Sequence, residues 1–137
     1  MNSSSSQRST QIRHLALVVD DDPVVQTLLE QFFKKLQFDL ICISKGKECV
    51  SAIENYKPQI IFLDLMLSDC TGFDVLKELQ QLEKVKDIPV ILMTATTDGK
   101  NIAKLNGVEP TGYLTKPFEF KDLSGLLNTF FNHITKK

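Results

Sequence analysis

The most constraining feature of the chain is a run of four apolar residues at positions 60–63 that ends on a carboxylate, Asp64. A short run rich in apolar residues, without polar alternation, is typical of a strand buried in a parallel sheet. A charge at the end of such a strand is costly unless it lies at the rim of the sheet. In open α/β sheets that rim, at the carboxyl ends of the strands, is where ligands bind. The stretch 59–73 therefore predicts a buried strand that delivers a carboxylate to a functional edge.

Similar apolar runs recur along the chain and alternate with helical patterns. The runs predict strands at 15–19, 40–43, 60–63, 90–93 and 113–114. Apolar residues at helical spacing predict helices at about 23–36, 47–56, 73–82, 101–105 and 119–133. Such alternation implies parallel strands joined by right-handed crossovers. We therefore expect one α/β domain over residues 13–137, preceded by a flexible serine-rich tail at 1–12.

Composition excludes several classes of protein. A chain of 137 residues is enough for one domain, and its net charge of −1 gives no reason to expect contact with nucleic acid or a membrane. No apolar run is long enough to span a bilayer. The cysteines, Cys42, Cys49 and Cys70, are odd in number and lack metal spacing, and the two histidines are isolated, so a zinc site is poorly supported. We interpret the cysteines as reduced thiols of a cytoplasmic protein.

Polar residues with useful chemistry end four of the five predicted strands. They are Asp20 with Asp21, then Asp64, Thr94 and Lys116. In a parallel sheet these ends meet at one edge, where crowded carboxylates repel one another unless a cation intervenes. Mg²⁺ prefers carboxylate oxygens, a lysine supplies charge for an anion, and a threonine hydroxyl donates a hydrogen bond. This set predicts a phosphoryl-transfer site whose nucleophile is a carboxylate.

Four short motifs carry a resemblance to a known family. VVDD at 18–21, FLDLM at 62–66, MTA at 93–95 and KPF at 116–118 resemble the receiver domain of two-component response regulators, the CheY-like domain. The similarity covers about residues 13–134. It implies a flavodoxin-like, doubly wound sheet of five parallel strands in the order 2-1-3-4-5, with five helices. It also implies a cis peptide bond before the proline of KPF.

The resemblance assigns a role to each matching residue at the acidic edge. It implies that Asp64 accepts a phosphoryl group from the phosphohistidine of a histidine kinase or a phosphotransfer protein. It implies that Mg²⁺ is held by Asp21, Asp64 and the backbone carbonyl of Met66, with Asp20 acting through water. It implies that Lys116 contacts the phosphoryl group and the acidic residues.

Two further residues are expected to change conformation on phosphorylation. The resemblance implies that Thr94 moves to bond a phosphoryl oxygen and that Tyr113 swings inward with it. Taken alone, Thr94 is more often an ordinary strand end and Tyr113 more often a core residue. In the same way Asp22 before Pro23 is simply a helix cap, and nothing near Cys70 in the sequence supports a redox role.

The chain departs from the family pattern in two places. Ser68 stands where the family usually has proline, so we expect a more mobile loop after Asp64. Five residues, VEPTG, lie between Gly107 and Tyr113, about two more than usual, although the interval from Thr94 keeps its normal length. We therefore expect the helix near 101–105 to be short or displaced.

These observations favour a single-domain, cytoplasmic response regulator that signals by protein–protein contact with an unidentified target. Its turnover would be limited to self-phosphorylation and slow self-dephosphorylation, and a phosphorylation-dependent dimer is left open. The initiating methionine favours a stand-alone chain, but the receiver portion of a larger DNA-binding regulator or hybrid kinase would look the same. A small phosphohydrolase would need a carboxylate where Met66 stands. The intact acidic set argues against a module that binds without phosphate.

Overall fold

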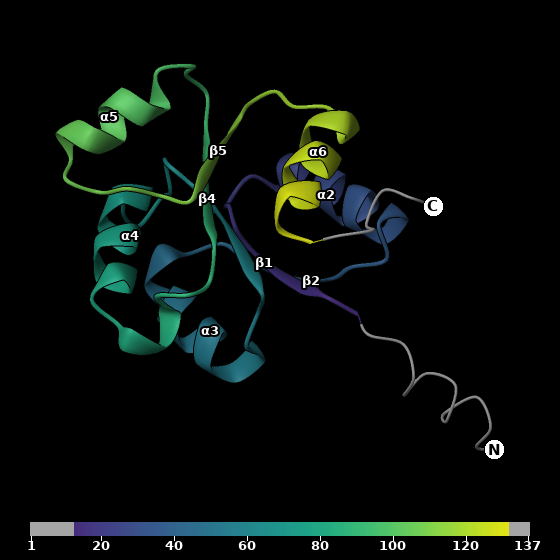
Figure 1. Ribbon diagram of the computed structural model, residues 1–137, viewed down its shortest axis with the longest axis horizontal. Coiled ribbons are helices and arrows are strands. Elements are labelled where there is room, and N and C mark those ends of the chain that lie inside the picture. Colours follow the sequence, from purple (N-terminus) through teal and green to yellow (C-terminus); the bar gives the residue numbers. More distant parts are fainter. Residues whose placement is uncertain (1–12, 132–137) are drawn as a thin grey trace.

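A computed structural model describes residues 13–131, so the predicted tail at 1–12 lies outside the described part of the chain. Its single sheet contains five parallel strands in the order β2-β1-β3-β4-β5, which confirms the predicted flavodoxin-like order (Figure 1). The strands are β1 (Leu15–Val19), β2 (Asp39–Ile43), β3 (Ile60–Asp64), β4 (Val90–Thr94) and β5 (Gly112–Thr115). The α-helices are α2 (Pro23–Lys35), α3 (Cys49–Tyr56), α4 (Gly72–Gln80), α5 (Gly99–Leu105) and α6 (Phe120–Phe130), with 3₁₀ turns η1 (Gly46–Glu48) and η2 (Glu83–Val85).

The helices cover both faces of the sheet, which gives the molecule two apolar cores. In β1, Ala16 and Val18 belong to the core under α2 and α6, whereas Leu17 and Val19 belong to the core under α3, α4 and α5 (Figure 1). Successive side chains of a strand point to opposite faces, so a strand covered on both sides must be apolar throughout. This is why the central strands appear in the sequence as unbroken apolar runs.

Local capping explains where the helices that flank the acidic edge begin. The Asp22 side chain accepts a hydrogen bond from the amide of Val24 at 2.9 Å, and Pro23 occupies the first turn, as predicted. Thr71 caps α4 and forms a reciprocal capping box with Asp74, so α4 begins one residue before the predicted start. Both caps lie in the loops that follow the carboxyl ends of central strands, Asp22 after β1 and Thr71 after β3.

Several predicted helix boundaries were wrong. The helix predicted at 47–56 begins as the 3₁₀ turn η1 and becomes α-helical only at Cys49. The helix predicted to reach His133 ends at Phe130, since Phe131 is extended and packs its ring against His14 and Phe38, with centroids 4.5 and 5.4 Å away. Tertiary aromatic packing therefore overrides the helical pattern at this end; residues 132–137 lie outside the described part of the chain.

The fourth α-helix is short, as the departure from the family pattern predicted. α5 has seven residues and starts at Gly99, two residues before the predicted start. It ends before Gly107, whose φ of 72° is the left-handed conformation that glycine adopts readily. Between residues 13 and 131, none of the helices combines the length and apolar character needed to cross a membrane.

Candidate functional site

The carboxyl ends of β1, β3, β4 and β5 meet at one rim of the sheet. Asp64 is the last residue of β3 and pairs in register with Met93, and Thr94 pairs with Thr115, the residue before Lys116. Asp20 follows β1, and its amide donates to the carbonyl of Ile43 at 3.0 Å. Parallel pairing thus brings together residues that are up to 96 positions apart.

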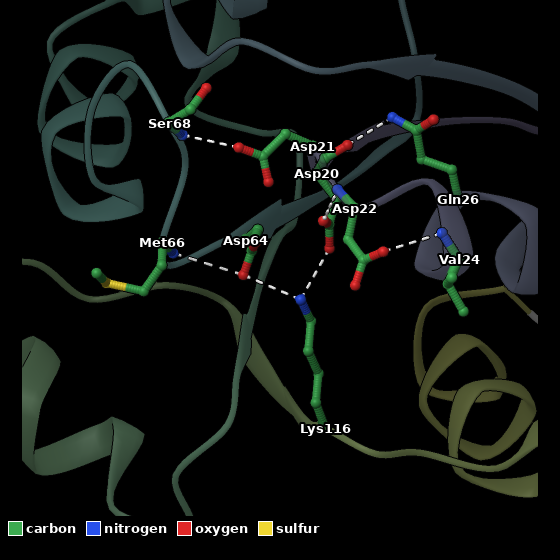
Figure 2. Close-up of polar contacts among 9 residues, drawn as sticks. All are labelled: Asp20, Asp21, Asp22, Val24, Gln26, Asp64, Met66, Ser68 and Lys116. Atoms are coloured by element: carbon green, nitrogen blue, oxygen red, sulfur yellow. Dashed lines mark hydrogen bonds and ion pairs between the residues drawn. The ribbon is translucent and has the colours of Figure 1, made fainter.

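Lys116 is the centre of the polar contacts at this rim (Figure 2). Its Nζ lies 2.9 Å from Oδ2 of Asp20 and 3.1 Å from Oδ1 of Asp64. The Asp20 side chain is fully buried and the Asp64 side chain is 10% exposed, so this ion-paired cluster is largely shielded from water. The Lys116 amide donates to the carbonyl of Thr94 at 2.7 Å, and the Lys116–Pro117 bond is cis, as the resemblance implied.

Burial and ion pairing shift the pKa values of Asp64 and Lys116. Burial raises the pKa of Asp64 above its usual value, the charge of Asp20 raises it further, and the contact with Lys116 only partly opposes these effects. Burial alone would lower the pKa of Lys116, but the hydrogen bonds and charges of Asp20 and Asp64 outweigh it and raise that pKa. Lys116 is therefore held as a cation, whereas burial and the charge of Asp20 disfavour the ionised form of Asp64.

Three carboxylates form a cluster with the chemistry of a divalent-cation site. One oxygen from each of Asp20, Asp21 and Asp64 lies within 4.8 Å of the others. Hard cations such as Mg²⁺ take oxygen ligands of this kind, and a cation would relieve the mutual repulsion. The donor set therefore fits such an ion. The Met66 amide approaches Oδ1 of Asp64 at 3.5 Å, whereas the ligand role of the Met66 carbonyl stays a prediction.

Four hydrogen bonds that the sequence did not predict brace the acidic cluster, and Figure 2 shows those among Asp20, Asp21, Asp22, Gln26 and Ser68. The amide of Asp22 donates to Oδ1 of Asp20 at 2.9 Å. The side-chain amide of Gln26 donates to the carbonyl of Asp20 at 2.5 Å and to Oγ of Ser44 at 3.3 Å. The amide of Ser68 donates to Oδ2 of Asp21 at 2.8 Å. The sequence places Gln26 four residues after the Asp22 cap, but nothing in it marks the Asp20 carbonyl as the acceptor of its side-chain amide.

Asp69 fastens the loop after β3 to the start of η1. Its two carboxylate oxygens accept the amides of Gly46 and Lys47, each at 3.0 Å. The hydrogen bond from the Lys47 amide is the largest cause of a lowered pKa for Asp69. A Cβ on Gly46 would lie 2.4 Å from Sγ of Cys70 and 2.6 Å from Val75, so only glycine permits this approach. The loop that we expected to be mobile is thus held at several points.

Thr94 and Tyr113, the two residues expected to switch, lie beside the same glycine. Thr94 is 2% exposed and its hydroxyl accepts the amide of Thr96 at 3.2 Å. Tyr113 is partly exposed, and burial and the charge of Glu109 raise the pKa of its hydroxyl. A Cβ on Gly99 would lie 3.0 Å from Cγ2 of Thr94 and 3.3 Å from the Tyr113 ring. The start of α5 therefore touches both side chains, while their coupled movement stays a prediction.

The cysteines show no activation. All three are free thiols, and burial raises the pKa of Cys42 to about 11 and that of Cys49 to about 12. Burial and the charge of Asp69 also raise the pKa of Cys70. A reactive cysteine needs a lowered pKa, so none of these thiols has the surroundings of a redox centre.

Comparison with known proteins identifies the family. The chain belongs to the response regulator receiver domain family, whose model matches residues 16–128. It is 34% identical over 110 residues to the alkaline phosphatase synthesis regulator PhoP of Bacillus subtilis, covering 79% of this chain and 44% of PhoP. It is 34% identical over 109 residues to the heme response regulator HssR of Staphylococcus saprophyticus, covering 78% of this chain and 46% of HssR.

A solved structure supports the same assignment. The receiver domain of a sensor histidine kinase from Pseudomonas aeruginosa is 26% identical, with a TM-score of 0.78, and covers 86% of this chain and 97% of that one. That structure has a magnesium ion coordinated in its active-site cleft. The chain spans about half the length of the curated relatives that it matches.

Proposed function

We propose that this protein is a response regulator that accepts a phosphoryl group on Asp64 and signals through a change in protein–protein contact. The observation that carries the proposal is the contact of Lys116 with both Asp20 and Asp64 at the carboxyl end of the sheet. Asp64 would be the nucleophile, with a raised pKa and a side chain that is 10% exposed, and Lys116 beside it would supply a cation for an incoming phosphoryl group.

The transfer converts the Asp64 carboxylate into an acyl phosphate. An Asp64 oxygen attacks phosphorus, the new P–O bond forms, and the P–N bond to the donor histidine breaks. Lys116 would balance the charge of the phosphoryl oxygens. Asp21, Asp64 and the Met66 carbonyl would hold Mg²⁺, with Asp20 acting through water, and the bound ion would supply positive charge to the phosphoryl group and to the crowded carboxylates.

The response to phosphorylation would use the contact of α5 with Thr94 and Tyr113. A phosphoryl group on Asp64 adds acceptor oxygens near the end of β4, and the Thr94 hydroxyl would donate to one of them. A Cβ on Gly99 would meet both Thr94 and Tyr113, so both side chains lie close to the start of α5, and a movement of Thr94 would open room for the Tyr113 ring. Phosphorylation would thereby shift a two-state surface near α5 and β5 toward its active form.

The partners follow from this chemistry. We propose a histidine kinase or phosphotransfer protein as the donor and a protein, rather than nucleic acid or a membrane, as the target of the domain itself. The free thiols between residues 13 and 131 support a cytoplasmic location. Catalysis would be limited to self-phosphorylation and slow self-dephosphorylation, since Met66 stands where a hydrolase would place its acid/base carboxylate.

The proposal is tested by incubation with acetyl phosphate, with and without Mg²⁺, followed by intact-mass measurement. We expect a Mg²⁺-dependent gain of one phosphoryl group in the wild type and in a D39N control, because Asp39 is an exposed carboxylate that pairs with Arg13 away from the cluster. We expect no gain in D64N. If acetyl phosphate fails, a phosphohistidine donor is used. Absence of labelling with both donors contradicts the proposal.

A second candidate is that this chain is the receiver portion of a longer regulator. The chain matches about half the length of relatives that include a DNA-binding response regulator from Mycolicibacterium smegmatis, 31% identical over 112 residues. An immunoblot of the native protein distinguishes the two. A band at the 15.5 kDa of this sequence supports a stand-alone regulator, whereas a band near twice that mass supports the longer one.

A further inference from the structure

A backbone amide from the loop after β3 contacts the acidic cluster directly. The N–H of Ser68 donates to Oδ2 of Asp21 at 2.8 Å, across 47 positions of sequence (Figure 2). Ser68 itself is exposed and Asp21 is only partly buried. The contact is therefore a short, charge-assisted hydrogen bond that joins the loop after β3 to the loop after β1.

This contact depends on the departure of the chain from its family pattern. Proline, which the family usually has at this position, carries no N–H and cannot donate. Serine restores the donor. The hydrogen bond uses the backbone, so the serine hydroxyl is not required for it, and alanine at this position would keep it.

The loop that presents the Ser68 amide is anchored on its other side. Asp69, the next residue, accepts the amides of Gly46 and Lys47 at 3.0 Å each. Within the loop, the amide of Leu67 donates to the carbonyl of Cys70 at 3.1 Å. Ser68 is thus held by the Leu67–Cys70 hydrogen bond within the loop and by the attachment of Asp69 to η1. These contacts fix the direction of the Ser68 N–H.

We propose that Ser68 is a positioning residue whose amide fixes the Asp21 carboxylate for a divalent cation, with Asp69 supporting the loop that carries it. This inference rests on the proposed function of the acidic cluster as a cation site. A carboxylate has acceptor capacity beyond one hydrogen bond, so Asp21 can take the Ser68 amide and a cation together. Hydrogen bonds to metal ligands orient them, and losing one commonly lowers metal affinity by about 10- to 100-fold.

The matched variants are S68P, which removes the amide donor, and S68A, which keeps it. We expect Mg²⁺ titration by calorimetry to show about tenfold weaker binding in S68P and unchanged binding in S68A. D69A keeps Ser68 and the three carboxylates but releases the loop, so it should weaken Mg²⁺ binding in the same direction by a smaller factor. Far-UV circular dichroism of each variant reports whether the fold is retained.

An NMR measurement on the wild-type protein keeps the inference testable if S68P does not fold. The Ser68 amide proton should resonate downfield, shift on Mg²⁺ addition, and move upfield in D21A. The amide of Lys47, which donates to Asp69, should keep its position in D21A. A Ser68 amide that does not bond the Asp21 carboxylate in solution would shift in neither experiment.

The outcomes separate the inference from the function on which it rests. If the wild type binds no Mg²⁺, the cation site of the proposed function fails and the inference fails with it. If the wild type binds Mg²⁺ and folded S68P binds it equally or more tightly, only the role of Ser68 is overturned. A Ser68 amide resonance that shifts neither on Mg²⁺ addition nor in D21A also overturns the proposed role of Ser68.

Discussion

Replacing Asp64 with asparagine should stabilise the folded protein when no divalent cation is present. The Asp64 charge lies 3.1 Å from Nζ of Lys116, an attraction of about 5.4 kcal/mol at an effective dielectric constant of about 20. Asp20 and Asp21 each place an oxygen within 4.8 Å of it, a repulsion of at least about 3.5 kcal/mol for each pair and about 7 kcal/mol together. The balance disfavours the ionised carboxylate, so D64N should gain roughly 1–2 kcal/mol.

The pH dependence of this gain follows from the raised pKa of Asp64. Burial and the charge of Asp20 raise that pKa in the folded state, so the folded protein retains this proton to higher pH than the unfolded chain. The stability associated with that proton is present below the ordinary carboxyl pKa and is lost as the pH rises through the raised value. D64N keeps its neutral side chain throughout, so its advantage should be absent in acid and complete near neutral pH.

The assay is urea unfolding followed by far-UV circular dichroism, in chelator and again in saturating Mg²⁺. In chelator at neutral pH, D64N should unfold at higher urea with an unchanged dependence on denaturant concentration. In Mg²⁺ its advantage should shrink or reverse, because ligand binding stabilises the wild type more than a variant that lacks one carboxylate. A D64N variant that is equal to or less stable than the wild type in chelator would refute the electrostatic reasoning.

Three further perturbations test other parts of the account. G72A should lower the free energy of unfolding by about 1–3 kcal/mol, because a Cβ at Gly72 would lie 2.5 Å from the Asp64 carbonyl. The control G125A lies in open space on α6 and should not lower it. Equal effects of the two substitutions would contradict this prediction. K116A should cost about 3–5 kcal/mol in chelator because the fully buried Asp20 loses its ion pair, and Mg²⁺ should restore part of this loss in the same urea assay. Cys42 and Cys49 should resist iodoacetamide in the native protein and react in urea, since burial raises their pKa values to about 11 and 12; rapid native alkylation measured by mass would contradict this.

The sequence predicted best the features that depend on local residue patterns, namely the strands and the residues at their carboxyl ends. The strands were predictable because β1, β3 and β4 are buried on both faces and must be apolar along their whole length. The acidic edge was predictable because parallel strands align their carboxyl ends, so Asp20, Asp64 and Lys116 had to converge.

The features that the sequence did not predict depend on contacts between distant loops. The amide of Ser68 and the carboxylate of Asp69 have partners 47 and about 22 positions away, and no residue pattern marks a backbone donor. The end of α6 was misplaced because Phe131 leaves the helix to pack on His14 and Phe38. Glycine disfavours a helix by propensity, whereas the buried Gly99 lets the start of α5 lie close to Thr94 and Tyr113.

The most direct test of the central claim is to locate the phosphorylated residue. After phosphorylation in Mg²⁺, borohydride reduces an aspartyl phosphate to homoserine, and peptide mass spectrometry then locates that homoserine. We predict homoserine at position 64 and unchanged aspartate at the other aspartate positions. Homoserine at Asp20 or Asp21, or none in a protein that has gained phosphoryl mass, would contradict it.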